Sequence, residues 1–260
     1  MKKQGVMIDG TIYSPSLKFD WNYSAYCPYL EAHEAMASLP VVYLLHGATG
    51  NHRNLSERFP LPTYLDEMIE AGEVSKCVVI FVDGLNSFYV DSPNFKMETA
   101  IIEDLIPTVE KRMGLSPNRD RRYIGGLSMG GYGACNLGLR YPELFSKVMA
   151  LSPAVWHTMT PETVTYDWHV FRDEHGNFDH NRWDAEHPKS QLTAYQSKDL
   201  PVSFFVMSGE SDEAVPVAEV KQFVADLSDV VEVTVHYTKA GDHSWPFWEL
   251  GTLRAFKEFF

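Results

Sequence analysis

The stretch Tyr123-Ile124-Gly125-Gly126-Leu127-Ser128-Met129-Gly130-Gly131 decides the fold. The apolar run up to Leu127 predicts a buried strand, and the segment Met129 to Arg140 predicts a helix that begins directly after Ser128. Between them lies a G-x-S-x-G pattern, which by itself also occurs in glycine-rich loops with an incidental serine. A strand before it and a helix after it favour a sharp turn that exposes the serine hydroxyl. Ser128 is therefore the candidate nucleophile.

Strand-like and helical patterns alternate along the rest of the chain. The expected strands are 40–45, 77–82, 147–151, 202–207 and 232–237, and the expected helices are 65–71, 99–113, 217–227 and 247–259. This alternation predicts an α/β fold with a mostly parallel central sheet and helices on both faces. Residues 10–29 are expected to add antiparallel edge strands. Pro107 is expected to kink its helix, and Gly114 to end it.

The chain has 260 residues, a length that suits one domain. We expect a single domain over residues 1–260. Residues 154–200 break the alternation, because they are rich in Trp, His, Asp and Asn and show little periodicity. This segment is predicted to be a lid-like insertion over the carboxyl ends of the strands.

Composition excludes several classes of partner and cofactor. The formal charge of −13 argues against nucleic acid or an anionic membrane as partner. No apolar run is long enough to span a bilayer, and the N-terminal residues lack the pattern of a signal peptide. The odd set Cys27, Cys77 and Cys135 argues against a disulfide framework and shows no metal-ligand spacing. The sequence therefore predicts a cytoplasmic protein without a metal site.

A serine nucleophile needs a base and an acid, and the chain offers candidates for both after Ser128. Strand 202–207 runs into a turn that carries Asp212, with Glu210 and Glu213 as competitors. Ten histidines compete for the role of base, but only His243 lies in a glycine-rich turn after the last expected strand. A histidine can accept the serine proton and return it to a leaving group. Asp212 and His243 are the preferred pair.

The loop after strand 40–45 is expected to help bind the oxyanion. In this arrangement one N–H comes from the residue after the nucleophile, here Met129, and the other from this loop, here Ala48. His46 precedes the turn and should point into the protein, where its hydrogen bonds would shape the loop.

Four short motifs, in order along nearly the whole chain, resemble the "putative esterase" family of α/β-hydrolases. That family includes esterase D, feruloyl esterases and acetyl-xylan esterases, and the most similar branch is the bacterial tributyrin esterases. The motifs are Tyr43-Leu44-Leu45-His46-Gly47-Ala48-Thr49-Gly50-Asn51, Asn86-Ser87-Phe88-Tyr89-Val90-Asp91, Gly126-Leu127-Ser128-Met129-Gly130-Gly131-Tyr132-Gly133-Ala134, and Gly241-Asp242-His243-Ser244-Trp245 with Trp248.

The resemblance implies an α/β-hydrolase fold and a carboxylesterase that hydrolyses short-chain acyl esters without a cofactor. It supports Ser128, Asp212 and His243 as a triad with the Ala48 and Met129 amides, and it implies a homo-oligomer, either a dimer or a tetramer. It also suggests that Phe88 and Tyr89 line the substrate pocket, with ordinary loop packing as the alternative. The density of aromatic residues in the lid adds two further candidates to this pocket, Trp168 and Trp183, whose alternative is a small core beneath the lid.

Other functions use the same residues. A feruloyl or acetyl-xylan esterase would share the chemistry on a plant-polymer substrate, and an acyltransferase would pass the acyl group to another alcohol. A catalytically silent binding protein is disfavoured by the intact serine, acid and histidine positions. A metallohydrolase is disfavoured because no H-E-x-x-H or similar cluster occurs, although residues 179–187 could bind an adventitious ion.

Overall fold

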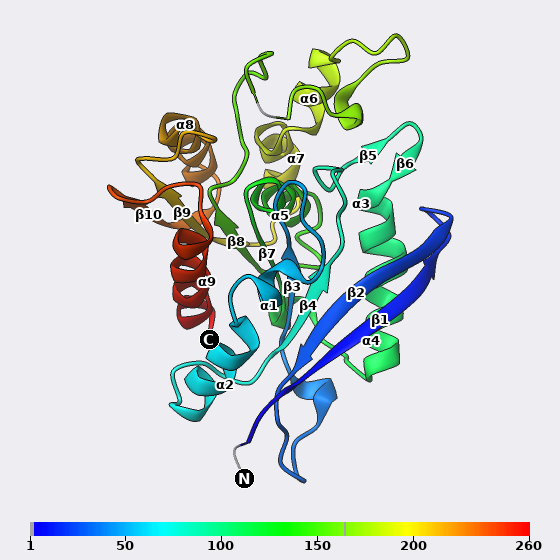
Figure 1. The fold of residues 1–260 in the computed structure, drawn as a ribbon, viewed down its shortest axis with the longest axis vertical. Helices are drawn as coiled ribbons and strands as arrows, with labels where there is room; N and C mark the ends of the chain where they lie inside the picture. The colour runs from blue at the N-terminus through cyan, green and yellow to red at the C-terminus, as the bar shows by residue number, and fades with distance from the viewer. Residues whose placement is uncertain (1–2, 164) are drawn as a thin grey trace.

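The computed structural model describes residues 3–163 and 165–260, and its main sheet lies at the centre of the fold (Figure 1). The strands follow the order β1-β2-β4-β3-β7-β8-β9-β10 across this sheet. Their bounds are β1 (Val6–Ser14), β2 (Phe19–Cys27), β3 (Val41–Leu45), β4 (Val78–Val82), β7 (Arg122–Leu127), β8 (Lys147–Leu151), β9 (Ser203–Gly209) and β10 (Glu232–Thr238). A separate short hairpin joins β5 (Asp91–Ser92) to β6 (Phe95–Lys96).

The sheet is parallel except at one edge, as the sequence predicts. β1 pairs antiparallel with β2, and β2 pairs antiparallel with β4. All pairings from β4 to β10 are parallel. The carboxyl ends of these six strands therefore meet at one edge, where the turns after β3, β7, β9 and β10 come together.

Alternate side chains of the central strands enter two separate cores, because successive residues of a strand point to opposite faces. In β3, Val41, Tyr43 and Leu45 belong to one core, and Val42 and Leu44 to the other. The first core is covered by α4 (Ile106–Met113), α5 (Met129–Arg140) and α8 (Val217–Ser228), and the second by α2 (Leu61–Glu70) and α9 (Trp245–Phe259). A short α1 (Asn54–Glu57) precedes α2. Within the described ranges, no helix is both long and apolar enough to cross a membrane.

The helix expected over 99–113 forms with an irregular first half. It comprises α3 (Met97–Thr99), a π-helical stretch η2 (Ala100–Leu105) and α4. Pro107, the second residue of α4, has no N–H to donate and its ring crowds the carbonyl one turn earlier, which fits the irregular π-helical stretch directly before it. Gly114 ends the helix with φ of 64°, in the left-handed region that glycine adopts readily.

The 154–200 segment lies at the end of the sheet to which the parallel strands point (Figure 1). It contains η4 (His169–Phe171), α6 (His180–Glu186), η5 (Pro188–Gln191) and α7 (Leu192–Gln196). Hydrogen bonds tie α6 to the rest of the fold. Among them, the Tyr132 hydroxyl donates to the Glu186 carbonyl at 2.8 Å, and the Arg182 guanidinium donates to the Asp91 carbonyl at 2.9 Å.

A partly buried ion network fastens the same segment to α5. Arg140, the last residue of α5, contacts Glu98 of α3 at 3.0 Å and also bonds Glu186 of α6. The Glu98 side chain is 7% exposed, and the Tyr141 hydroxyl donates to it at 2.8 Å. Burial raises the pKa of Glu98, and the Arg140 charge counters part of that rise. Arg140 therefore compensates a carboxylate that would otherwise be costly to bury.

Replacing Arg140 with Met is expected to lower the free energy of unfolding by about 3–5 kcal/mol, because Glu98 and Glu186 would lose their shared cation. Urea unfolding followed by circular dichroism measures this change. The matched control is Arg58→Met, since Arg58 is exposed and a surface change of this kind stays within about 0.5 kcal/mol. Equal stabilities of the two variants would show that the network contributes nothing.

Candidate active site

Ser128 occupies the turn between β7 and α5 in a strained backbone conformation. Its φ of 56° and ψ of −118° are unusual for a residue with a side chain, and such strain costs about 1–3 kcal/mol. Backbone bonds hold it there: the Ser128 N–H donates to the Leu151 carbonyl at 2.8 Å, and its own carbonyl accepts from Tyr132 and Ala154 at 3.0 Å each. The turn is thus fixed by β8 and α5 together.

The two glycines of the motif are required by close backbone contacts. A Cβ on Gly126 would lie 2.4 Å from the carbonyl carbon of Gly130, and one on Gly130 would lie 2.2 Å from the carbonyl oxygen of Leu45. Neither neighbour can move without displacing the sheet or the helix. The G-x-S-x-G pattern is therefore a steric requirement of this turn.

Three side chains from distant parts of the chain form a continuous hydrogen-bonded row. The Ser128 Oγ lies 2.9 Å from His243 Nε2, and His243 Nδ1 lies 2.7 Å from Asp212 Oδ2. The other oxygen of Asp212 accepts the N–H groups of Ala214 at 3.0 Å and Val215 at 2.8 Å. The Asp212 side chain has no exposed surface, whereas that of His243 is 21% exposed. The serine is therefore placed to give its proton to an imidazole that a buried carboxylate orients.

The loops that carry the acid and the histidine are bonded to each other. The Ser211 N–H donates to the Gly241 carbonyl at 2.9 Å, and a Cβ on Gly209 would lie 2.1 Å from that same oxygen. The competing acids point elsewhere: Glu210 pairs with Lys221 at 3.5 Å and Glu213 is exposed. Asp242, next to the histidine, is exposed and accepts from the Ser244 hydroxyl. Of the acids weighed from sequence, Asp212 is the one in contact with His243.

Two N–H groups near the serine, those of Met129 and Ala48, have no acceptor in the described part of the chain and are therefore the candidates for binding an oxyanion. Met129 is the first residue of α5, so its N–H has no acceptor within the helix. Ala48 lies in the loop after β3, and its N–H finds no acceptor among the residues that the structure describes. Gly47, just before it, is so close to the nucleophile that a Cβ there would lie 3.4 Å from that of Ser128.

His46 supports this loop from within the protein, as its position predicts. Its ring is fully buried; Nε2 accepts the Gly84 N–H at 2.9 Å, so Nδ1 carries the proton that it donates to the Gly47 carbonyl at 2.7 Å. The Tyr89 hydroxyl donates to the His46 carbonyl at 2.9 Å. These bonds fix the course of the chain immediately before Ala48.

The four aromatic residues considered for substrate binding are mostly inside the protein. Phe88 and Tyr89 have no exposed surface and Trp183 is 1% exposed, while Trp168 is half-buried. The ring of Phe88 packs edge-on against those of Trp168 and Trp183, at centroid distances of 5.7 and 5.9 Å. This arrangement corresponds to the packing alternative, a core beneath the 154–200 segment, and it offers a substrate little surface of Phe88, Tyr89 or Trp183.

His187 lies in a polar stretch of sequence, where a solvated ring is the usual outcome, but in the structure it is buried. It is 6% exposed and its ring lies 6.0 Å from that of Tyr132 and 5.6 Å from that of Trp183. Burial lowers the pKa of His187 to about 4, so the ring is neutral near pH 7. No group of three or more His, Cys, Asp or Glu side chains within the described residues is arranged to hold a metal ion, and this includes the stretch 179–187.

Known proteins resemble this chain over nearly its whole length. Residues 14–258 match the family described as "Putative esterase". The acetyl esterase of Caldicellulosiruptor saccharolyticus is 24% identical over 233 residues, which is 85% of this chain and 83% of that protein. Among solved structures, a ferulic acid esterase shares 21% identity with a TM-score of 0.81, covering 98% of both chains. The S-formylglutathione hydrolase of Staphylococcus aureus shares 19% identity with a TM-score of 0.79, covering 98% of this chain and 99% of that one. The structural neighbours establish the α/β-hydrolase fold.

Proposed function

The chain belongs to the putative-esterase family, and from this premise we propose that it is a serine carboxylesterase for short-chain acyl esters. Its general class, a carboxylic ester hydrolase, follows from the family and from the acetyl esterase relative. The observation that carries the finer proposal is the row from Ser128 through His243 to Asp212, with successive separations of 2.9 and 2.7 Å.

In the proposed mechanism the ester carbonyl lies beside Ser128, and its oxygen is directed at the N–H groups of Ala48 and Met129. The serine oxygen attacks the carbonyl carbon while His243 Nε2 accepts the serine proton. Negative charge then develops on the carbonyl oxygen, where the two N–H groups and the amino end of α5 stabilise it. Asp212 stabilises the positive imidazolium that forms.

The second half of the reaction releases the acid. His243 gives its proton to the departing alkoxide, so the alcohol leaves and an acyl-serine remains. Water then attacks the acyl carbon as His243 accepts a proton from it, and the collapse of this second intermediate returns the proton to Ser128. The chain's own residues suffice for every step, so the proposal includes no cofactor.

Initial rates on p-nitrophenyl acetate, butyrate and octanoate, measured beside methyl ferulate, test this proposal. We expect the highest kcat/KM on acetate or butyrate. The reason is that the relative aligned with most of this chain is named as an acetyl esterase, an enzyme for a short acyl group. Preference for octanoate would contradict the short-chain assignment while leaving the esterase class intact.

A feruloyl esterase is the second candidate, and the structural neighbour named as a ferulic acid esterase favours it. It predicts that methyl ferulate exceeds the p-nitrophenyl esters in kcat/KM. Acyl transfer, the third use of the same residues, predicts new esters when acceptor alcohols are added, which product analysis detects.

Three further features stay predictions from the sequence. They are a cytoplasmic location, assembly as a dimer or tetramer, and a lid role for residues 154–200.

A further inference from the structure

His243 lies on the loop between β10 and α9, and the row of hydrogen bonds holds its ring only by the two nitrogens. The bond from Nδ1 to Asp212 fixes which nitrogen faces Ser128, but it leaves the ring free to tilt about the direction of that bond. The His243 side chain is 21% exposed, so the protein does not enclose it on every side. Proton transfer needs Nε2 to stay within hydrogen-bond reach of the Ser128 Oγ, so a further contact on the ring bears directly on the reaction rate.

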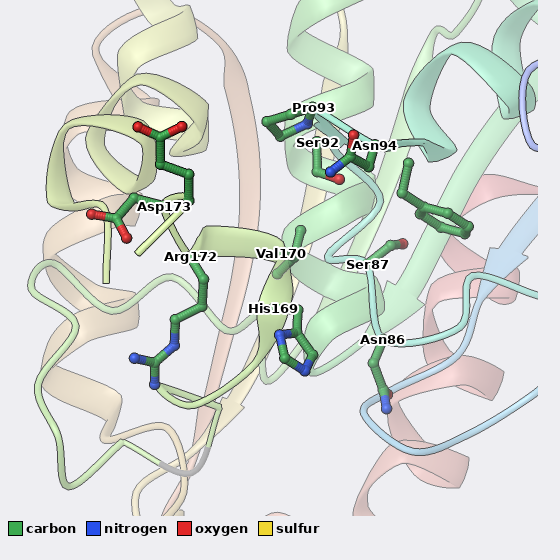
Figure 2. A pocket seen from close by; sticks show the side chains of 11 residues that line it. Asn86, Ser87, Ser92, Pro93, Asn94, His169, Val170, Arg172 and Asp173 are labelled. Atoms are coloured by element: carbon green, nitrogen blue, oxygen red, sulfur yellow. The ribbon is translucent and has the colours of Figure 1, made fainter. Parts of the chain in front are cut away.

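This further contact comes from the first turn of α9. The cavity shown in Figure 2 does not supply it, because no hydrogen bond or ring contact joins His243 to any of the described residues that line that cavity. The indole of Trp248 instead packs against the imidazole, with the ring centroids 4.9 Å apart and the ring planes at 85°. Side chains of a helix lean toward its amino end, so Trp248 reaches back over the loop that carries the histidine. The perpendicular indole therefore restrains the tilt that the bond to Asp212 leaves free.

Trp248 is itself held in one orientation by its neighbours. Its Nε1 donates to the Ser152 hydroxyl at 3.3 Å, and Ser152 is fully buried while Trp248 is 7% exposed. A buried indole N–H needs such an acceptor, so this bond selects the rotation of the ring. Trp245 packs against the same indole, with centroids 5.4 Å apart and planes at 87°. The ring that touches His243 is thus fixed by contacts that do not involve the histidine.

Ser152 presents its hydroxyl from a strained backbone position directly after β8. Its φ of 42° lies in the left-handed region, which is costly for a residue with a side chain, and its N–H donates to the Met207 carbonyl at 2.8 Å. Such strain persists where the surrounding structure enforces it, and it is concentrated at functional sites. The preceding residue, Leu151, accepts the Ser128 N–H at 2.8 Å. The end of β8 therefore bonds the nucleophile through residue 151 and supports the histidine, by way of Trp248, through residue 152.

We propose that Trp248, anchored by Ser152, is a positioning residue that keeps His243 Nε2 at the distance from Ser128 that proton transfer needs. The inference rests on the proposed esterase function, in which His243 is the base. Trp248 acts through His243, so its loss lowers kcat and leaves the affinity for the ester unchanged. The effect is large because a displacement of about 1 Å at a reacting group can cost about 10²-fold in rate.

The test removes the indole and then restores a ring. In Trp248→Leu we expect kcat on p-nitrophenyl butyrate to fall about 10- to 100-fold, with KM nearly unchanged. Trp248→Phe keeps a ring beside the imidazole and should recover most of this loss. The matched control is Phe256→Leu, which truncates another buried aromatic residue of α9, one that packs against Phe260, and should leave kcat close to that of the wild type. Urea unfolding of each variant measures the loss of stability separately.

Ser152→Ala tests the anchor. It should lower kcat a few-fold in the wild type and have no further effect in Trp248→Phe, which lacks the N–H that Ser152 accepts. Additive losses in the double variant would contradict the proposed anchoring, and this comparison decides even if Trp248→Leu does not fold.

The rate at which a fluorophosphonate labels Ser128 gives a second readout, because it depends on His243 as base but not on ester hydrolysis. The inference is overturned if Trp248→Leu turns over and is labelled as fast as the wild type. It is also overturned if Phe256→Leu loses as much kcat as Trp248→Leu at equal stability. Failure of the proposed function is distinguishable from both, because the wild type would then hydrolyse no ester, while slower labelling of Trp248→Leu would still support the positioning role.

Discussion

Replacing Ser128 with Ala is expected to reduce kcat on p-nitrophenyl butyrate by about 10⁴-fold or more, leaving the residual rate that binding and the oxyanion donors sustain. The change removes the atom that lies 2.9 Å from His243 Nε2 and leaves no other hydroxyl in that position. Folding should survive, because the turn is held by backbone bonds from Leu151, Tyr132 and Ala154, which do not involve the side chain.

Two further measurements complete this experiment. A fluorophosphonate probe should label the wild type at Ser128 and fail to label the variant, as mass spectrometry of the adduct would show. Ser146→Ala is the matched control, because the Ser146 hydroxyl is buried, has no hydrogen-bond partner among the described residues and takes no part in the row. Turnover by Ser128→Ala within tenfold of the wild type would refute the nucleophile assignment and, with it, the proposed mechanism.

The elements around the nucleophile could be predicted from the sequence because local rules determine them. The strand that ends at Leu127 and the helix over Met129–Arg140 form at the expected positions. The glycines at 126 and 130 allow the close backbone contacts that this sharp turn requires. The meeting of Asp212 and His243 could also be anticipated, because parallel strands place the turns that follow them at one edge of the sheet.

The features that sequence did not reveal depend on contacts between distant segments. The burial of Phe88 and Trp183 depends on how the 154–200 segment folds over α5. The sequence of that segment shows no periodicity from which this packing could be predicted. The hydrogen bond that the Thr49 N–H donates to the Asn86 side chain joins residues 37 positions apart, and the contact of Arg140 with Glu98 joins residues 42 positions apart. Hydrophobic pattern specifies which faces are buried, whereas such pairings require the packed structure.

His187 illustrates the same limit for a titratable group. Polar neighbours in sequence predict a solvated ring, but the ring lies against Tyr132, Trp183 and Phe223 in the folded protein. The burial that lowers its pKa comes from three elements that are separate in the chain. A residue's own segment therefore gives little information on its charge state when another segment covers it.

Replacing Asp212 with Asn should reduce kcat by about 10⁴-fold, although the two side chains have nearly the same shape. The reason lies in the partners of Asp212 Oδ1, which are the N–H groups of Ala214 and Val215. These donors require an acceptor, so the amide oxygen must occupy that position and the NH₂ group must face His243 Nδ1. Nδ1 would then accept a hydrogen bond from the amide, and the imidazole's own hydrogen would lie on Nε2, directed at Ser128. In that tautomer the ring cannot take the serine proton.

The matched control is Asp242→Asn, which makes the same chemical change at the neighbouring exposed acid and should alter kcat by less than a few-fold. The two backbone bonds to residue 212 remain in Asp212→Asn, so its urea midpoint should stay close to that of the wild type. NMR of the imidazole nitrogens distinguishes the tautomers directly, with the hydrogen on Nδ1 in the wild type and on Nε2 in the variant. A variant that keeps the wild-type tautomer and more than a tenth of the activity would show that the carboxylate does not orient His243. An altered tautomer with activity lost and stability retained would establish that its role is to fix which nitrogen faces the serine.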